Sequence, residues 1–169
     1  MQNALAAKRV LITQAAAFMG PALCEVFAEQ GAQVVRSDAT FADLEAAQTL
    51  ATQAGAIDVL VANLAIVAPS TPATGVGEEE WRQVFAALVD PLPRLVKAFA
   101  PGMISRGAGK ILVIGSASAL RGMKRDSTYS AARGAQLAYV QALGAELASK
   151  NIQVNAIAQN FVDNPTYFP

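Results

Sequence analysis

Short apolar runs alternate along this chain with longer segments whose apolar residues recur at helical spacing. The runs are rich in valine, isoleucine and leucine and end in small or polar residues, which is typical of buried strands. Each interval between them leaves room for a helix. The expected strands are Lys8–Thr13, Gln33–Ser37, Ile57–Ala62, Lys110–Gly115 and Ile152–Ile157.

Helix signals fill the intervals between the expected strands. A glycine at position 31 ends the first helix, and three glutamates favour the positive end of the third. Pro91 and Pro93 interrupt this third helix and are expected to kink it. The expected helices are Gly20–Gln30, Phe41–Ala54, Glu78–Arg106 and Thr128–Lys150.

Strand and helix alternate throughout, which predicts a parallel sheet with helices on both faces, an α/β fold of three layers. Residues 1–169 are expected to form a single domain, because this length suffices for one core but not for two ordinary domains. Ligands of such sheets bind outside the carboxyl ends of the strands. The polar residues near these predicted ends, which should converge on one edge, are Thr13, Asn63, Ser116 and Asn160.

The composition excludes several kinds of function. Thirteen basic and thirteen acidic residues cancel, so no basic surface argues for nucleic acid. The chain has no histidine, which excludes Ser-His-Asp and Cys-His catalysis and most zinc sites, and we expect no metal. The one cysteine, Cys24, is expected to be a buried thiol. Without a signal peptide pattern or a membrane-spanning apolar stretch, the sequence predicts a soluble, cytoplasmic protein.

A serine, a tyrosine and an arginine recur at a spacing that suits proton abstraction. Tyr129 follows Ser116 by thirteen positions and precedes Arg133 by four, so the last two share one face of a predicted helix. A free tyrosine has a pKa of about 10 and is a poor base near neutral pH. A guanidinium one turn away favours the phenolate while keeping its own charge, and Ser116 could hold a substrate oxygen. On spacing alone, an ordinary surface pair beside a strand end is an equally good interpretation.

The loop after the first strand lacks the glycines that a dinucleotide binder uses for a tight turn and for close approach to the pyrophosphate. Residues 13–20 are TQAAAFMG, in which only Gly20 remains. Gln14 and Phe18 stand where glycines are expected, and Phe18 would direct its ring towards the place of a cofactor. We therefore expect no nucleotide cofactor, the alternative for Phe18 being a core aromatic.

These motifs resemble the short-chain dehydrogenase/reductase superfamily, and within it the halohydrin dehalogenases more closely. The superfamily carries a glycine-rich loop, Asn-Ala-Gly after a middle strand, and Ser…Tyr-x-x-x-Lys. This chain has Asn63–Ala65 at the second motif and an arginine in place of the lysine. Halohydrin dehalogenases show a Thr-Phe-Gly pattern and a Ser-Tyr-Arg pattern with fixed gaps, which Thr13–Gly20 and Ser116–Arg133 match. The resemblance covers essentially the whole chain and implies a Rossmann-like, doubly wound sheet.

The resemblance also implies roles for the matched residues. Tyr129 would remove the hydroxyl proton of a vicinal haloalcohol, Arg133 would favour the ionised phenol, and Ser116 would bind the substrate oxygen. The alkoxide would displace the neighbouring halide, giving an epoxide without a cofactor, and a halide or another small anionic nucleophile would reopen the epoxide. The residues expected around the leaving halide are Phe18, Gln159, Asn160 and Phe161, and Asn164–Pro169 resembles the halide-pocket region of the family.

Several positions depart from the dehydrogenase pattern. Leu88 stands where active dehydrogenases have a proton-relay asparagine, and Asp38 is expected to be a helix-start or loop carboxylate rather than a ribose ligand. Asn63 is expected to be structural. The interval between the second and third strands has room for one helix and no further strand. Relatives continue beyond the position of Pro169 with a last helix and strand, so we expect either part of a longer chain or a shortened relative.

Two other functions stay open on the sequence. One is an NAD(P)-dependent oxidoreductase of alcohols or ketones with an unusual loop, and the other is an inactive scaffold that assembles through its long helices. Because the family is usually tetrameric, we expect a homo-oligomer, and Trp81 and Phe85 are expected to be packing or interface residues. No pattern in the sequence predicts the preferred halide, the substrate size or the enantiomer.

Overall fold

The computed structural model describes residues 3–162, and its elements follow the predicted alternation. The strands are β1 (Arg9–Thr13), β2 (Gln33–Ser37), β3 (Val59–Asn63), β4 (Gly109–Ile114) and β5 (Ile152–Ile157). The helices are α1 (Gly20–Glu29), α2 (Leu44–Ala54), α3 (Glu78–Leu88), α4 (Pro91–Arg106) and α5 (Ser127–Leu147). Short 3₁₀ turns are η1 (Ala73–Gly75), η2 (Ala117–Ala119) and η3 (Ala148–Lys150).

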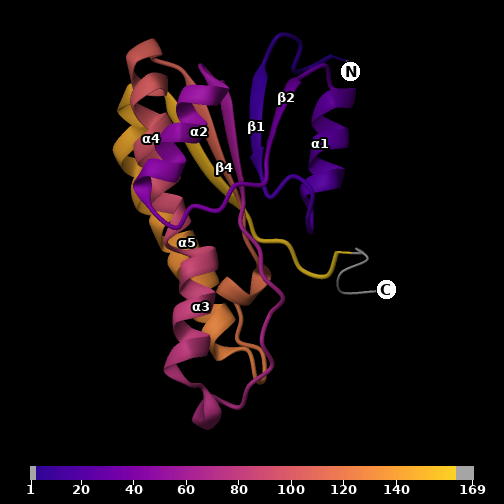
Figure 1. Cartoon of the computed structure of the whole chain (residues 1–169), viewed down its shortest axis with the longest axis vertical. Helices are drawn as coiled ribbons and strands as arrows, with labels where there is room; N and C mark the ends of the chain where they lie inside the picture. The colour runs from indigo at the N-terminus through magenta and orange to yellow at the C-terminus, as the bar shows by residue number, and fades with distance from the viewer. Residues whose placement is uncertain (1–2, 163–169) are drawn as a thin grey trace.

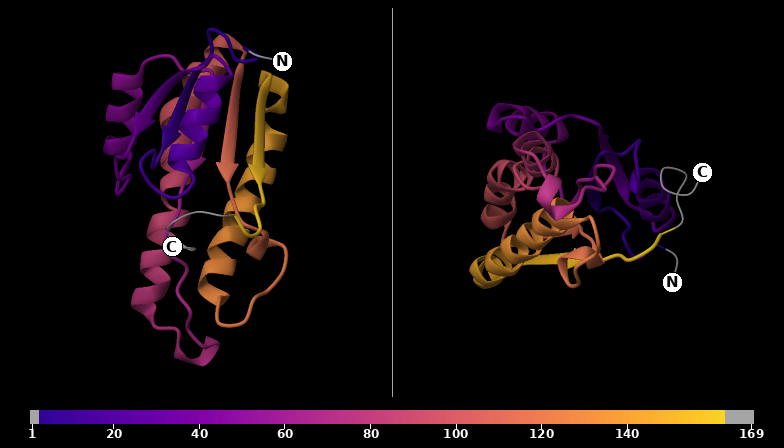
Figure 2. Two further views of the ribbon diagram at one scale, coloured as in Figure 1. Left: turned by 90° about the vertical axis from the view of Figure 1, so that its right-hand side faces the viewer. Right: turned by 90° about the horizontal axis from the view of Figure 1, so that it is seen from below.

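The strands form a five-stranded parallel sheet in the order β2-β1-β3-β4-β5. The chain winds from β1 to β2 in one direction and from β3 to β5 in the other, so the switch point lies between β1 and β3. In the described residues, α1 packs on one face, and α2, α4 and α5 pack on the other (Figures 1 and 2). The predicted doubly wound, Rossmann-like α/β fold is confirmed, as is the single helix between β2 and β3.

Apolar side chains on the two faces of the sheet form two cores. Val10 and Ile12 of β1 pack with Cys24 of α1, whereas Leu11, which lies between them, belongs to the core under α2, α4 and α5. Because strand side chains alternate between faces and both faces are covered at the centre of the sheet, β1 and β3 are apolar over most of their length. Cys24 is 1% exposed, and burial raises the pKa of its thiol, so the predicted buried thiol is confirmed.

The prediction of one kinked helix over Glu78–Arg106 is wrong, because two helices form there. α3 ends at Leu88, and the N–H groups of Val89 and Asp90 both donate to the Phe85 carbonyl oxygen. Pro91 is the first residue of α4, where a proline needs no partner for an N–H group and its fixed φ suits a helix. The proline therefore starts a new helix instead of bending an existing one.

The start of α2 also differs from the prediction, by three residues. Asp43 is the N-cap, and its Oδ1 accepts a hydrogen bond from the Ala46 N–H at 2.9 Å. Phe41, predicted to be helical, is instead buried in the core ahead of the helix. The cap, rather than the apolar spacing, sets where this helix begins.

The loops beyond the carboxyl ends of the strands are joined by polar side chains. Thr13 Oγ1 donates to the Asn63 carbonyl oxygen at 3.0 Å. The Asn63 side-chain amide donates to the carbonyl oxygens of Gln14 and Ala17 at 3.1 and 3.3 Å, which agrees with the predicted structural role. α3 and the first turns of α5 extend beyond this edge of the sheet (Figure 1).

An aromatic pair lies on α3. Trp81 stacks on Phe85 with ring centroids 4.5 Å apart, and Trp81 is 46% exposed. A subunit interface at this pair, and the homotetramer, stay predictions. Within residues 3–162, no helix combines the length and the apolar character needed to cross a membrane.

Candidate active site

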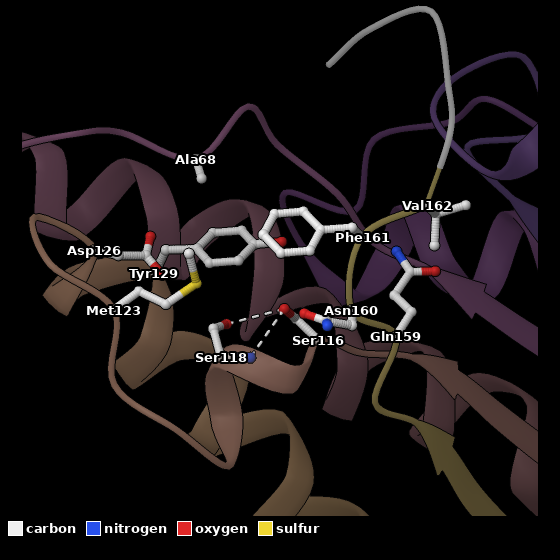
Figure 3. A pocket seen from close by; sticks show the side chains of 10 residues that line it. All are labelled: Ala68, Ser116, Ser118, Met123, Asp126, Tyr129, Gln159, Asn160, Phe161 and Val162. Atoms are coloured by element: carbon white, nitrogen blue, oxygen red, sulfur yellow. Dashed lines mark hydrogen bonds between the residues drawn. The ribbon is translucent and has the colours of Figure 1, made fainter. Parts of the chain in front are cut away.

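A cavity of about 330 Å³ lies beyond the carboxyl ends of β4 and β5 (Figure 3). This volume is in the range of small-molecule sites. Its walls come from the loop after β3, from the segment between β4 and the first turn of α5, and from the loop after β5. The lining residues are Ala68, Ser116, Ser118, Met123, Asp126, Tyr129, Gln159, Asn160, Phe161 and Val162.

Ser116 follows β4 and lines this cavity, as predicted from its place at a strand end. Its Oγ accepts hydrogen bonds from the Ser118 N–H at 3.2 Å and from the Ser118 hydroxyl at 3.0 Å. A hydroxyl group has two lone pairs and one hydrogen. Because both lone pairs are occupied, the Ser116 O–H is left to donate into the cavity. The sequence analysis missed Ser118, which gives Ser116 this orientation.

Tyr129 and Arg133 lie one turn apart on α5, as predicted. Arg133 Nη2 donates to the phenol oxygen at 2.9 Å, and the guanidinium carbon lies 4.9 Å from the ring centroid. Tyr129 is half-buried and lines the cavity, whereas Arg133 is only 3% exposed. The alternative interpretation, an ordinary surface pair, is therefore wrong.

Neutral acceptors rather than a carboxylate hold the Arg133 guanidinium. Nη1 donates to the carbonyl oxygens of Leu64 and Ile114 at 2.9 and 3.0 Å, and to Gln136 Oε1 at 2.8 Å. Across residues 3–162, no acidic side chain forms an ion pair with Arg133. A buried cation without a counter-ion is costly, and a phenolate at Tyr129 would neutralise it at hydrogen-bond distance.

Gln136 connects Arg133 to the end of α3. Its Oε1 accepts from Arg133, and its Nε2 donates to the carbonyl oxygen of Leu88. The side chains of Gln136 and Leu88 are both buried, so Leu88 fills the relay position with an apolar group. The sequence analysis missed Gln136, although a polar residue three positions after Arg133 was an available signal.

Replacing Gln136 with leucine is expected to lower the free energy of unfolding by about 1–3 kcal/mol, because the buried Leu88 carbonyl loses its side-chain donor and Arg133 loses an acceptor. Urea unfolding followed by circular dichroism measures this change. Gln141→Leu on the exposed side of the same helix is the matched control, expected within about 0.5 kcal/mol of the wild type. Equal effects of the two substitutions would contradict a bridging role for Gln136.

The loop between β1 and α1 adopts a glycine-like conformation at two residues that are not glycine. Gln14 and Phe18, the residues found where glycines were expected, have φ values of 44° and 52°. This left-handed region is unfavourable for residues with a side chain. The Gln14 amide offsets part of the cost, because it accepts from the Ala65 N–H at 2.8 Å and donates to the Ala65 carbonyl oxygen at 3.1 Å.

A smaller cavity of about 20 Å³ lies between this loop and the Tyr129–Arg133 pair. It has room for one particle of about the size of a water molecule. Phe18 and Gln159 line it together with the tyrosine and the arginine. Tyr129 and Gln159 also line the large cavity, so the two cavities share these two residues.

The four residues predicted around a halide are distributed over the two cavities, and their role stays a prediction. Gln159, Asn160 and Phe161 line the large cavity, and Phe18 and Gln159 line the small one. Asn160 Oδ1 accepts from Arg121 at 2.6 Å, and Phe161 is 73% exposed. The segment Asn164–Pro169 lies outside the described residues.

Comparison with known proteins shows the family to which the chain belongs. The profile of a family described as enoyl-(acyl carrier protein) reductase matches residues 8–167. The chain belongs to the short-chain dehydrogenase/reductase superfamily.

Individual relatives in the superfamily differ in their named activities. Galactitol 2-dehydrogenase (L-tagatose-forming) of Cereibacter sphaeroides is 34% identical over 92% of this chain and 62% of its own length. The 3-oxoacyl-(acyl-carrier-protein) reductase FabG of Chlamydia trachomatis serovar D is 30% identical over 96% of this chain and 77% of its own. A solved structure described as a dehalogenation enzyme is 31% identical, with a TM-score of 0.86 over 98% of this chain and 77% of its own.

The residues of this short-chain dehydrogenase/reductase do not fit a nicotinamide dinucleotide. Gln14 and Phe18 replace glycines that would allow the pyrophosphate to approach the backbone. Asp38, a ribose ligand in NAD enzymes, uses its Oδ1 to accept from the Ala16 N–H at 2.8 Å, which agrees with the predicted loop carboxylate. Arg133 replaces the lysine, and its hydrogen bonds end on protein oxygens.

Proposed function

We propose that this protein is a halohydrin dehalogenase, which converts vicinal haloalcohols into epoxides with release of halide and a proton, reversibly and without a nucleotide. One observation carries the proposal. The Tyr129 phenol accepts a hydrogen bond from a buried guanidinium that has no acidic partner in the described residues, and Tyr129 lines both a substrate-sized cavity and an ion-sized one.

The proposed reaction begins when the substrate hydroxyl binds between Ser116 and Tyr129. The phenolate takes the hydroxyl proton, while the Ser116 O–H donates to the developing alkoxide. The alkoxide oxygen attacks the neighbouring carbon from the side opposite the halogen. The carbon–oxygen bond forms as the carbon–halogen bond breaks, and the halide leaves with the bonding electrons. The proton then passes from Tyr129 to solvent.

The small cavity is the proposed place of the leaving halide. Phe18 lines it on the side of the β1–α1 loop, and an aromatic ring has a positive edge that suits an anion. Arg133 lines it as well, and its Nε is buried without an acceptor in the described part of the chain. We assign Phe18 and Gln159 to the halide, and Asn160 and Phe161 to the substrate side of the phenol.

An NAD(P)-dependent oxidoreductase of alcohols or ketones is the alternative, favoured by relatives that are named as dehydrogenases and reductases. The dehalogenation enzyme has similar identity and supports the proposal. We prefer dehalogenation because Gln14, Phe18 and Arg133 all stand where a dinucleotide binder has other residues. Phe18 and Arg133 line the proposed halide cavity, and Gln14 holds the loop that carries Phe18.

The purified protein is expected to release chloride from 1,3-dichloro-2-propanol in a buffer that contains no nucleotide. Each chloride should be accompanied by one proton and one epichlorohydrin, as measured with a chloride electrode, a pH-stat and gas chromatography. Samples without protein correct for spontaneous ring closure.

The same preparation, given NADH or NADPH with a panel of ketones, tests the alternative. Consumption of the reduced nicotinamide without any chloride release from the haloalcohol would overturn the proposal in favour of the oxidoreductase. Turnover of neither substrate class would favour the inactive scaffold.

A further inference from the structure

The large cavity contains an acidic side chain that the proposed mechanism does not use. Asp126 lies at the N-cap position of α5, three residues before Tyr129, and it lines the large cavity but not the small one. Its side chain makes no capping hydrogen bond to the helix backbone. The common structural role of an aspartate at this position is therefore absent here.

The Asp126 carboxylate is poorly satisfied by the protein itself. Its Oδ2 accepts from the Ser130 hydroxyl at 3.0 Å, and no donor within residues 3–162 reaches the other oxygen. The neighbouring cation, Arg125, instead donates to the hydroxyl and the carbonyl oxygen of Ser70. Partial burial raises the pKa of the Asp126 carboxyl, and the hydrogen bond from Ser130 opposes this effect. The site thus holds an acceptor that lacks a donor.

The position of Asp126 in the cavity suggests which part of a bound haloalcohol would point towards it. Figure 3 shows Asp126 and Met123 near the end of the Tyr129 side chain that joins the backbone, and Gln159 on the side of its hydroxyl group. Gln159 also lines the small cavity that would take the halogen. With the substrate oxygen at Tyr129 and the halogen towards Gln159, the remaining substituent of the carbinol carbon extends towards Asp126.

We propose that Asp126 makes this site selective for haloalcohols whose remaining substituent ends in a hydroxyl group, an inference that rests on the proposed dehalogenase function. A hydroxyl would donate to the free carboxylate oxygen. An alkyl group of the same size would cover that oxygen and remove water without replacing the hydrogen bond. Sites built to bind a substrate hydroxyl reject analogues that lack it for this reason.

Two substrates of equal shape test the inference. In 3-chloro-1,2-propanediol a hydroxyl group stands where 1-chloro-2-butanol has a methyl group. The measured quantity is the ratio of kcat/KM for the diol to kcat/KM for the butanol, with chloride release as the signal. We expect the wild type to prefer the diol by about 10- to 100-fold, as a hydrogen bond to a charged group allows. Asp126→Leu should reduce the ratio to about one or below.

Matched variants separate charge from shape. Met123→Leu changes the shape of the cavity wall on the same side but does not alter the Asp126 carboxylate. It should leave the ratio within about threefold of the wild type. Asp126→Asn keeps the shape but not the charge, so its ratio should fall between those of the wild type and Asp126→Leu. This second variant also decides the matter should Asp126→Leu fail to fold, as judged by circular dichroism.

The possible results distinguish the two proposals. Chloride release from both substrates with a ratio that neither Asp126 variant changes would overturn the role of Asp126 and leave the dehalogenase intact. A wild type that prefers the butanol would do the same. No chloride release by the wild type from either substrate or from 1,3-dichloro-2-propanol would overturn both proposals.

Discussion

Replacing Tyr129 with phenylalanine is expected to lower kcat for chloride release by about 10²- to 10⁴-fold, the range lost with a general base. The substitution removes a single oxygen, the atom that accepts from Arg133 at 2.9 Å and that would take the substrate proton. The ring stays in the wall of both cavities, so KM should change much less than kcat. Initial rates with 1,3-dichloro-2-propanol in a pH-stat give both constants.

Tyr139→Phe is the matched control for this experiment. Tyr139 lies on the same helix and packs against the core, where burial, reinforced by the nearby Glu146, raises the pKa of its phenol. Tyr139 therefore stays protonated in the assay, and its loss should leave kcat unchanged. Tyr129→Phe should keep the wild-type circular dichroism spectrum, with a stability loss of at most about 1–3 kcal/mol from the unpaired guanidinium. Full activity without the Tyr129 hydroxyl would rule out the phenolate mechanism.

Arg133→Lys is expected to lower kcat/KM for chloride release at neutral pH by about tenfold or more, the effect of losing a hydrogen bond to a charged group. Lysine keeps the charge but has one nitrogen, which cannot replace the planar fork that reaches three protein oxygens and the phenol. The phenol oxygen therefore loses its well-placed donor. Initial rates with 1,3-dichloro-2-propanol at neutral pH test this loss.

Arg133→Lys should also lower the free energy of unfolding by about 2–4 kcal/mol, because buried carbonyl oxygens lose their donors. Assays well below the melting temperature of the variant separate this effect from the chemistry. Arg82→Lys is the control, since Arg82 is exposed and pairs with Glu79 on the surface of α3. A value of kcat/KM for Arg133→Lys equal to that of the wild type would be incompatible with a catalytic phenol held by a buried guanidinium.

Much of the fold follows from local patterns. The bounds of β2 and β5 agree with the prediction to the residue. In β5 apolar and polar residues alternate, which is the local pattern of a strand with one exposed face. The errors occur where one residue outweighs periodicity. Asp43 delays the start of α2 by capping it, and Pro91 begins a helix where a kink was expected.

The candidate site was predictable to a smaller extent. Helical spacing placed Tyr129 beside Arg133, and the strand end placed Ser116 on the same edge. The contributions of Ser118, Gln136 and Asp126 were missed, because each depends on what lies opposite the side chain. Of the residues predicted around the halide, Gln159, Asn160 and Phe161 line the large cavity, and Phe18 lines only the small one, because it comes from a different loop.

The sequence by itself determined the order of the elements, the edge of the sheet where the candidate site lies, and the serine, tyrosine and arginine that are found there. Helix and strand periods are local properties, and they bring residues together over one turn or at one strand end. Only the tertiary structure decided that Arg133 is buried and that, among residues 3–162, it has no acidic partner, because its acceptors include Leu64, 69 positions away in the chain. That environment depends on how α5 packs against the sheet and α3. It leaves the Arg133 guanidinium beside the Tyr129 phenol as the group that an ionised phenol would pair with.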